Sequence, residues 1–351
     1  MDPTTRSSTP TVPAATGAPP IEDGLAAEWD ALADGGGVPP YLRPGWFAAW
    51  WAAFGTGELE VRVARRSGRL TAVLPLARSG GHLGSPTNAH SPAFGPIARD
   101  PAAARDLLVD VVADGGRVRL SGLGAAENAA VAEAAEAAGR PVLSALMQRS
   151  PYVDLEHPDD RPHRRFKADL RRRRRRLSEL GEVDLDVYRG GPDLPARLDE
   201  GLGLEAAGWK GDRNTAILGR PALHEFYGAV AAWASGRDAL RLYFLRLDGA
   251  AVAFVFALTD GRAVHLVKSG LDPAFARFSP SQLLLEDVIA RARQDGARHV
   301  ELLGGEEPYK QAWTGRTRDR MRVDLFSASV KGRLVRSALV HRANALRGHP
   351  A

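Results

Sequence analysis

Alternating hydrophobic and polar residues at 61–66 and 70–76 predict two strands in the first half of the chain. Ser67-Gly68 between them is typical of a hairpin turn. Helical spacing predicts helices from residue 21 to the glycines at 35–37, then at 45–54, 102–114 and 127–139, with a short strand at 117–120. The segment 82–96 is rich in Gly, Ser and Pro, and we expect a long loop of the kind that is often functional.

The second half contains three alternating runs in close succession. Asp248-Gly249 and Asp260-Gly261 separate the runs 240–247, 250–258 and 263–269, which predicts two hairpins. Further strands are predicted at 152–155, 183–189, 298–303 and 321–327, and helices at 163–180, 194–207, 221–235, 281–295, 308–314 and 330–347. A meander followed by a helix and a strand indicates an α+β fold, not a doubly wound sheet.

The order of elements is similar in the two halves, although no clean sequence repeat relates them. We therefore expect a disordered tail at 1–20, an N-terminal unit at 21–150, a C-terminal unit at 151–330, and a basic C-terminal helix or tail at 331–351.

Composition adds several exclusions. The chain has 351 residues, 44% of them hydrophobic, and no cysteine, which excludes disulfides, thiolate metal sites and a cysteine nucleophile. The longest apolar run, Ala250 to Leu258, is too short to span a bilayer. The first twenty residues show no apolar signal segment. We expect a cytoplasmic protein with no integral membrane segment.

Positive charge is concentrated in one block. Residues 1–150 carry 13 basic and 15 acidic side chains, and the remainder carries 34 and 27. The excess comes from Arg161, Arg164, Arg165, Lys167 and the run 171–176. Such a helix is either a solvated face or a surface that binds the phosphates of a nucleic acid, a nucleotide or an acidic carrier. No RNA-binding motif accompanies it, and we expect no DNA partner.

Four places could carry chemistry. The first is Phe278-Ser279-Pro280-Ser281-Gln282, where Ser279 and Gln282 predict a capping box and the helix start could receive an anion. A well-capped structural helix is the alternative.

The second place is Trp209-Lys210 between two glycines, which is typical of an exposed loop with a stacking surface and a positive charge. The third is the segment after the glycines 304–305, where Tyr309 can return a proton to a leaving thiolate and Lys310 can hold an anion, with Trp313 following. Surface or packing roles are the alternatives in both places.

The fourth place is a pair on the third meander strand. His265 and Lys268 point to opposite faces of that strand unless a bulge intervenes. The chain lacks P-loop, serine-hydrolase and zincin motifs, and its histidines show no ligand spacing, so we predict no metal.

Together these motifs resemble the CelD/BcsL-like branch of the GNAT superfamily of N-acyltransferases. The resemblance rests on the basic segment 164–181, on Trp209-Lys210-Gly211 with 215–217, on Phe278-Ser279-Pro280, and on Gly305-x-x-x-Tyr309-Lys310-x-x-Trp313. In the first half, Pro44-x-Trp46, Leu74-Pro75-Leu76 and His90-Ser91 are also similar to that family.

The resemblance implies two tandem GNAT-like domains, each a mostly antiparallel mixed sheet flanked by helices, as in the Fem-type aminoacyltransferases. It implies that the strands near 263–269 and 298–303 splay apart to admit acetyl-CoA or another acyl-CoA. The implied cofactor-binding residues are Arg277, Ser279, Ser281 and Gln282. The implied catalytic residues are Tyr309, Lys310, Lys210 and His265, and the implied substrate-binding residues are Trp209, Lys268 and Trp313.

The implied activity is transfer of an acyl group to an amine of a sugar, an envelope precursor or a small metabolite. One departure favours alternatives: the segment 276–282 has no glycine, whereas classical members carry a glycine-rich loop there. The alternatives are a Fem-type transferase that uses aminoacyl-tRNA, a donor held on an acyl carrier protein, and a non-catalytic GNAT-like protein of exopolysaccharide biosynthesis.

Overall fold

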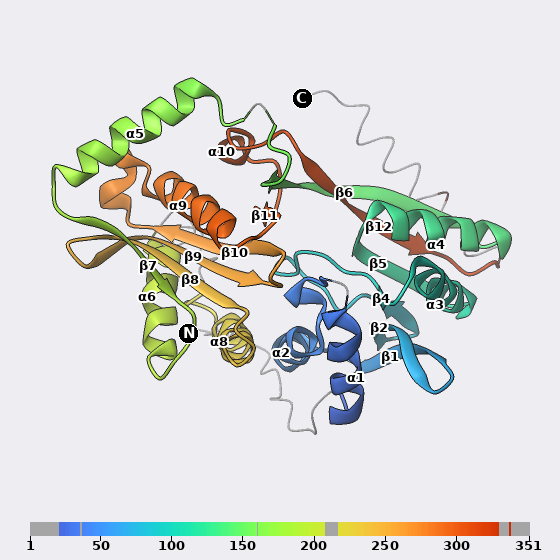
Figure 1. The fold of residues 1–351 in the computed structure, drawn as a ribbon. Coiled ribbons are helices and arrows are strands. Elements are labelled where there is room, and N and C mark those ends of the chain that lie inside the picture. The colour runs from blue at the N-terminus through green and yellow to red at the C-terminus, as the bar shows by residue number, and fades with distance from the viewer. Residues whose placement is uncertain (1–20, 36, 160, 208–216, 330–336, 338–351) are drawn as a thin grey trace, which may run out of the picture.

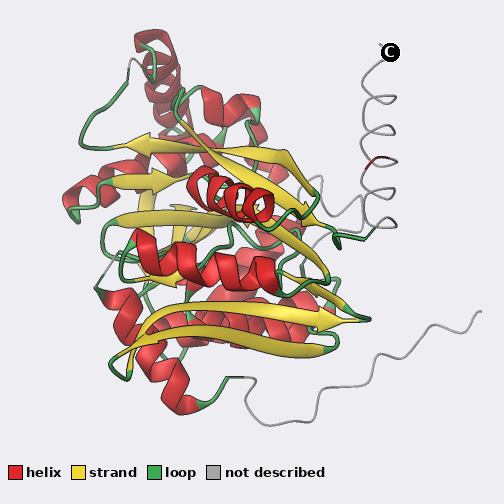
Figure 2. Ribbon diagram, turned by 90° about the vertical axis from the view of Figure 1, so that its right-hand side faces the viewer, coloured by secondary structure: helices red, strands yellow, loops and turns green. Residues whose placement is uncertain are grey.

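The computed structural model describes residues 21–35, 37–159, 161–207, 217–329 and 337. Within these residues the strands form one 12-stranded sheet, flanked by helices (Figures 1 and 2). Its path runs β1-β2-β3-β5-β12-β6-β11-β10-β9-β8-β7, and β4 pairs with β2 beside this path. Most neighbouring strands are antiparallel; β3–β5 and β10–β11 are parallel. The predicted α+β class with a mostly antiparallel mixed sheet is confirmed.

The first half supplies one side of the sheet and four α-helices. Its helices are α1 (Asp23–Asp34), α2 (Pro44–Phe54), α3 (Pro101–Ala113) and α4 (Ala125–Ala137), with a 3-10 turn at Pro40–Leu42. Its strands are β1 (Glu58–Arg66), β2 (Arg69–Ser79), β3 (His82–Gly84), β4 (Ile97–Ala98), β5 (Arg117–Leu123) and β6 (Val142–Asp154). The predicted hairpin of β1 and β2 is present, and the predicted loop at 82–96 begins with the short strand β3.

The second half contains the expected meander. Its strands are β7 (Val183–Tyr188), β8 (Leu240–Leu247), β9 (Ala250–Thr259), β10 (Ala263–Leu271), β11 (His299–Glu301) and β12 (Thr317–Leu325). Its helices are α5 (Arg164–Ser178), α6 (Leu194–Ala207), α8 (Pro221–Ser235), α9 (Pro280–Gln294) and α10 (Pro308–Gln311), with a 3-10 turn at Pro273–Phe278. Asp248 and Gly249 both have positive φ, 48° and 81°, as the predicted tight hairpin requires.

Three strands differ from the sequence prediction. The expected strand at 152–155 is the end of β6, which runs unbroken from 142 to 154 and pairs with β12 and then with β11. The last strand, expected at 321–327 and grouped with the second half, spans 317–325 and lies between β5 and β6 of the first half. The strand expected at 298–303 is only three residues long. Local alternation could not reveal these pairings, because their partners are distant in sequence.

Aromatic side chains join the two halves into one core. Trp46 of α2 meets Phe226 of α8 edge-on at 5.1 Å between ring centroids, and Phe54 lies 5.3 Å from the same ring. Gly45 is essential here, because a Cβ at that position would lie 2.0 Å from the indole nitrogen of Trp233. The predicted helical face of Trp46 and Trp50 is therefore the face that packs against the second half.

The second-half sheet is covered on both faces. Helix α9 packs against β8, β9 and β10 on one face, with the buried residues Leu283, Leu284 and Val288. Helices α6 and α8 cover the opposite face, where Phe254 and Phe256 are buried. The expected tail at 1–20, the loop around Trp209 and Lys210, and most of the expected C-terminal helix at 330–347 lie outside the described residues.

Gly270 of β10 sets the distance between this strand and α6. A Cβ at Gly270 would lie 2.3 Å from the backbone nitrogen of Glu205, and neither backbone can move independently of its element. We expect Gly270→Ala to lower the free energy of unfolding by about 1–3 kcal/mol through overpacking. Urea denaturation measures this change.

The matched control is Gly203→Ala on α6 itself, where nothing lies within 4 Å of the added methyl group. This variant should raise stability by about 0.5–1 kcal/mol, because Gly is a poor helix former. Equal effects of the two substitutions would contradict the close approach of α6 to β10.

Candidate active site

The second-half sheet splits next to β10. β10 pairs in parallel with β11 over only three residue pairs, Ala263 to His265 against His299 to Glu301. β10 then continues to Leu271, whereas the segment that follows β11 turns away from it. Leu303 and Gly304 in this turn have positive φ values, 52° and 58°. A non-glycine residue in this conformation is strained, and such strain is concentrated at functional sites. The expected splay of the two strands is present.

A bulge in β10 changes the expected orientation of two candidate residues. His265 pairs with Leu258 and Lys268 pairs with Phe256, with the register shift between Leu266 and Lys268. Because Leu258 and Phe256 are two residues apart, His265 and Lys268 lie on the same face of the sheet. The sequence alone could not predict that both side chains share a face, because no residue type in β10 indicates the bulge.

Beside the splay is a cavity of about 210 Å³ lined by both halves of the chain. Val267, Lys268, Leu303 and Gly304 come from the two diverging segments, and residues 87–92 of the long loop line the other side. His90 Nδ1 is 3.0 Å from the Tyr227 hydroxyl, and Lys268 Nζ lies 5.7 Å from the centre of the same ring. Burial, and then the charge of Glu205, raises the pKa of Tyr227 well above its usual value, so this hydroxyl keeps its proton.

Lys310 holds the turn that follows β11. Its Nζ donates to the carbonyl oxygens of Leu303 at 2.6 Å and Gly305 at 3.4 Å, and lies 2.7 Å from Glu307 Oε2. The side chain is buried, so the ammonium is held against these oxygens and away from bulk water. Through these contacts Lys310 holds the strained turn in place. The expectation that it holds an anion of the substrate stays a prediction.

Tyr309 precedes Lys310 on α10 and is half exposed. Loss of hydration, and then the negative charge of Glu307, raises the pKa of Tyr309 to about 12. The hydroxyl therefore remains protonated at neutral pH and can donate a proton.

The start of α9 differs from the predicted capping box. Ser279 has φ 53° and its side chain makes no cap hydrogen bond; instead Ser279 Oγ accepts from Arg173 Nη1 at 2.9 Å. Gln282 Oε1 accepts from Trp313 Nε1 at 2.7 Å. The left-handed conformation of Ser279 explains the difference, because an N-cap side chain reaches the helix amides from the extended region.

Nothing in the sequence distinguishes Arg173 from the other arginines of the run 171–176. It belongs to α5, which passes close to α9 (Figure 1). It also donates to the carbonyl oxygen of Arg277 at 3.0 Å and pairs with Asp169 at 2.7 Å. A guanidinium thus stands at the N-terminus of α9, where classical loops offer glycine amides. Arg277 and Ser279 are far from Arg173 in sequence, so only the structure identifies them as its partners.

The other expected residues divide into exposed and buried groups. Arg277 is exposed with its guanidinium 4.7 Å from the Phe278 ring, and Ser281 is partly exposed in the first turn of α9. Trp313 is buried against Phe166, with ring centroids 5.3 Å apart, so it supports the α9 N-terminus. His265 is buried on the α6 side of the sheet, and Trp209 and Lys210 lie outside the described residues.

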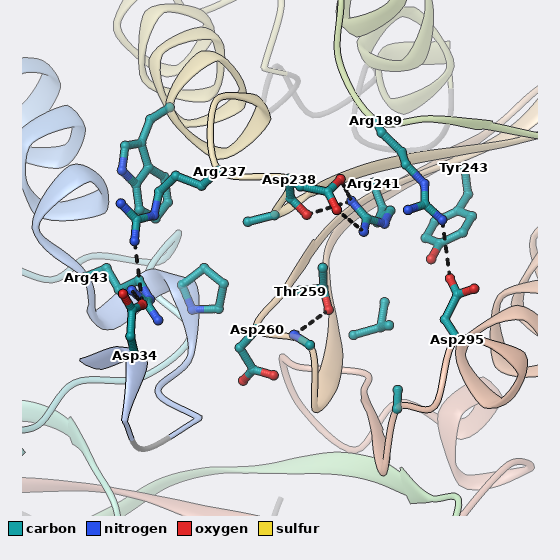
Figure 3. A pocket seen from close by; sticks show the side chains of 16 residues that line it. Asp34, Arg43, Arg189, Arg237, Asp238, Arg241, Tyr243, Thr259, Asp260 and Asp295 are labelled. Carbon is teal, nitrogen blue, oxygen red and sulfur yellow. Dashed lines mark hydrogen bonds and ion pairs between the residues drawn. The ribbon is translucent and has the colours of Figure 1, made fainter. Parts of the chain in front are cut away.

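A larger cavity of about 500 Å³ lies at the start of β8 and the end of β9 (Figure 3). Four arginines and four aspartates line it. The guanidiniums are paired, for example Arg43 with Asp34 at 2.6 Å, Arg241 with Asp238 at 3.0 Å and Arg189 with Asp295 at 3.5 Å. With no excess of either charge, this cavity is a salt-bridged junction and not an anion site.

The described part of the chain contains neither a metal-ligand cluster nor a membrane-spanning helix. No group of three or more His, Asp or Glu residues there could hold a metal ion. No helix in the same residues is both long and apolar enough to cross a membrane.

Residues 164–311 match the family model of the acetyltransferase (GNAT) domain, so this segment is similar to GNAT acetyltransferase domains. The matched residues include α5, the splayed strand β10 and the start of α9. No curated protein matches the sequence.

Solved structures share the fold across both halves. The C-terminal domain of a putative lysylphosphatidylglycerol synthetase from Agrobacterium fabrum has a TM-score of 0.59 at 15% identity, covering 90% of this chain and 94% of that one. FemX has a TM-score of 0.57 at 10% identity, covering 85% and 95%. L-PGS from Bacillus licheniformis has a TM-score of 0.53 at 12% identity, covering 88% and 93%. At these identities the likeness concerns the fold alone.

The contacts of Lys310 predict its contribution to stability. We expect Lys310→Met to lower the free energy of unfolding by about 1–3 kcal/mol, because two carbonyl oxygens lose their buried donor. Lys167→Met, on the exposed face of α5, is the control and should change stability by less than about 0.5 kcal/mol. Equal stability of both variants in urea denaturation would argue against the positioning role.

Proposed function

We propose that this protein transfers an acyl group from a CoA-type thioester, such as acetyl-CoA, to an amine of a sugar, an envelope precursor or a small metabolite. One observation carries the proposal: β10 and β11 diverge after three residue pairs inside the segment that matches the acetyltransferase domain. A gap of this kind exposes backbone groups that can hold the pantetheine arm of a donor.

The start of α9 is the proposed site for the donor phosphates. Backbone N–H groups and the helix dipole favour an anion there. Arg173 adds a cation at the same place, held by Ser279 Oγ and the Arg277 carbonyl. This guanidinium compensates for the missing glycines, because a long side chain can reach a phosphate that the backbone cannot approach closely. Arg277, Ser281 and Gln282 complete the proposed site.

The proposed reaction is direct attack. The neutral acceptor amine bonds through its nitrogen to the thioester carbonyl carbon and gives one proton to a general base, which can be water. The tetrahedral carbon then re-forms its C=O bond as the C–S bond breaks with the electron pair on sulfur. Tyr309 is the proposed donor of a proton to the departing thiolate, and its raised pKa keeps the hydroxyl protonated at neutral pH. Lys268, His265 and the Trp209–Lys210 loop are the proposed acceptor-side residues, and Lys310 holds the turn between donor and acceptor.

Donor binding is tested by thermal unfolding with acetyl-CoA and CoA. A ligand that binds only the folded state stabilises it by about 2.7 kcal/mol at a hundredfold excess over its dissociation constant. We expect both molecules to raise the unfolding temperature, and Ser281→Glu to weaken the shift because a carboxylate would face the phosphates. Ser79→Glu, at the exposed end of β2, should leave the shift unchanged.

The same experiment with bulk tRNA tests the second candidate, a Fem-type aminoacyl-tRNA transferase. The basic face of α5 favours this alternative: Arg164, Arg165, Lys167, Arg171, Arg175 and Arg176 are exposed, and no ion pair is seen for them within the described ranges. A tRNA shift that falls steeply with salt, without a CoA shift, would replace the first proposal with this one.

Removal of the Tyr309 hydroxyl tests the proposed proton donor. We expect Tyr309→Phe to reduce turnover about 100-fold while KM for the donor stays within about twofold. The fold should be unaffected, since Tyr309 is half exposed. Steady-state kinetics with an acetylated amine product measures the change, and full activity of the variant would assign the proton to another group.

A further inference from the structure

A third cavity, of about 370 Å³, lies at the closed end of the splay. Ala263 and His265 of β10, Glu301 of β11 and Tyr41 of the first half line it, together with residues 93–96 of the long loop. Arg320 of β12 lines this cavity and also the smaller one beside Lys268. The two cavities are therefore neighbours on one face of the sheet.

Two hydrogen-bond acceptors face this cavity side by side. His265 and Glu301 are register partners on parallel strands, which places their side chains next to each other on the same face. They are 2% and 4% exposed. His265 Nδ1 and Glu301 Oε2 are both buried without a hydrogen-bond partner in the part of the chain that the structure describes. Buried polar atoms are nearly always paired, so both atoms point to a ligand with donors.

The remaining atoms of both side chains are already engaged. His265 Nε2 lies 3.2 Å from Asp260 Oδ2, and Glu301 Oε1 accepts from Arg318 Nε at 2.9 Å. Burial raises the pKa of Asp260, but contact with His265 and the N–H groups of Ala263 and Arg262 outweigh it and hold the pKa below its usual range. Asp260 therefore engages Nε2, and Nδ1 is the ring nitrogen left to face the cavity.

Arg320 supplies the opposite charge. Its Nε is buried and has no hydrogen-bond partner, and no ion pair of Arg320 occurs among the described residues. Tyr41, Glu301 and Arg320 all line this cavity, so the two charged groups border the same space. The Tyr41 ring meets His265 edge-on at 5.2 Å and forms an apolar wall.

We propose that this cavity is the acceptor subsite and binds a zwitterionic amine of amino-acid size. Its amino group donates to Glu301 Oε2 and His265 Nδ1, and its carboxylate or phosphate accepts from Arg320. Glu301, Arg320 and Tyr41 thereby become specificity-determining residues for the proposed transfer. This inference rests on the proposed function and narrows its acceptor to molecules that carry an amine and an anion together.

The experiment is thermal unfolding of the full chain with individual probes. The probes are each proteinogenic α-amino acid and phosphoethanolamine, with ethylamine and propionate as analogues that lack one of the two charges. We expect at least one zwitterion to raise the unfolding temperature and both analogues to fail. Titration of that zwitterion should give dissociation constants at least about tenfold higher in Glu301→Gln and in Arg320→Gln, because each loses a charged hydrogen-bond partner.

Two control variants separate binding from folding. Arg298→Gln alters another arginine of the same cavity, which pairs with Glu156 at 3.4 Å, and should change affinity less than about threefold. Arg318→Gln removes the partner of Glu301 Oε1 but leaves Oε2, so it reports the effect of breaking that ion pair alone.

Three outcomes overturn the inference: no zwitterion binds the unaltered protein, the analogues bind equally well, or Glu301→Gln binds normally. In the first case ordered water satisfies the buried atoms, and in the other two the paired charges do not select the ligand. A parallel titration with acetyl-CoA keeps the two proposals apart. Donor binding without zwitterion binding removes only the acceptor subsite, whereas zwitterion binding without donor binding removes the proposed acyl transfer from CoA.

Discussion

The short parallel pairing of β10 with β11 is the constraint on which the site depends. Three residue pairs hold the strands together, and everything beyond them is free to diverge. β6 fixes β11 from the other side, so the divergence cannot close by a shift of β11 toward β10. The turn at Leu303 and Gly304 then needs its own support, which the buried ammonium of Lys310 provides. The short pairing of β10 with β11 therefore accounts for the gap between the strands, the strained turn at Leu303 and Gly304, and the burial of Lys310.

In the proposed donor site, charge would take over a task that backbone flexibility performs in the glycine-rich loop of classical GNAT enzymes. Ser279 and Pro280 make the start of α9 stiff, and no glycine lets the chain approach a phosphate. Arg173 of α5 is fixed at the start of α9 by Ser279. Neighbouring arginines lie on the exposed face of α5, where their long side chains are open to a ligand. A site built from long side chains tolerates more varied donors than a tight backbone cradle, which is why the CoA and tRNA hypotheses both find support in the same helix.

Local sequence patterns predicted the elements well and their partners poorly. The hairpin of β1 and β2, the meander and the basic helix follow from alternation, Asp-Gly turns and helical spacing, all of which act over a few residues. The place of β12 between β5 and β6, the bulge that brings His265 and Lys268 to one face, and the contact of Arg173 with Ser279 depend on residues far apart in sequence. Glu301 and Arg320 were missed for the same reason, since an isolated charge in a strand carries no signal until its neighbours are known.

The position of β12 has a consequence for synthesis on the ribosome. β5 and β6 are complete by residue 154, but the strand that lies between them is not translated until residue 325. Throughout that interval the nascent chain presents two unpaired strand edges, which are templates for intermolecular pairing. The first half therefore cannot reach its native sheet as a separate folding unit. The long sequence separation of these contacts makes the last step of folding slow.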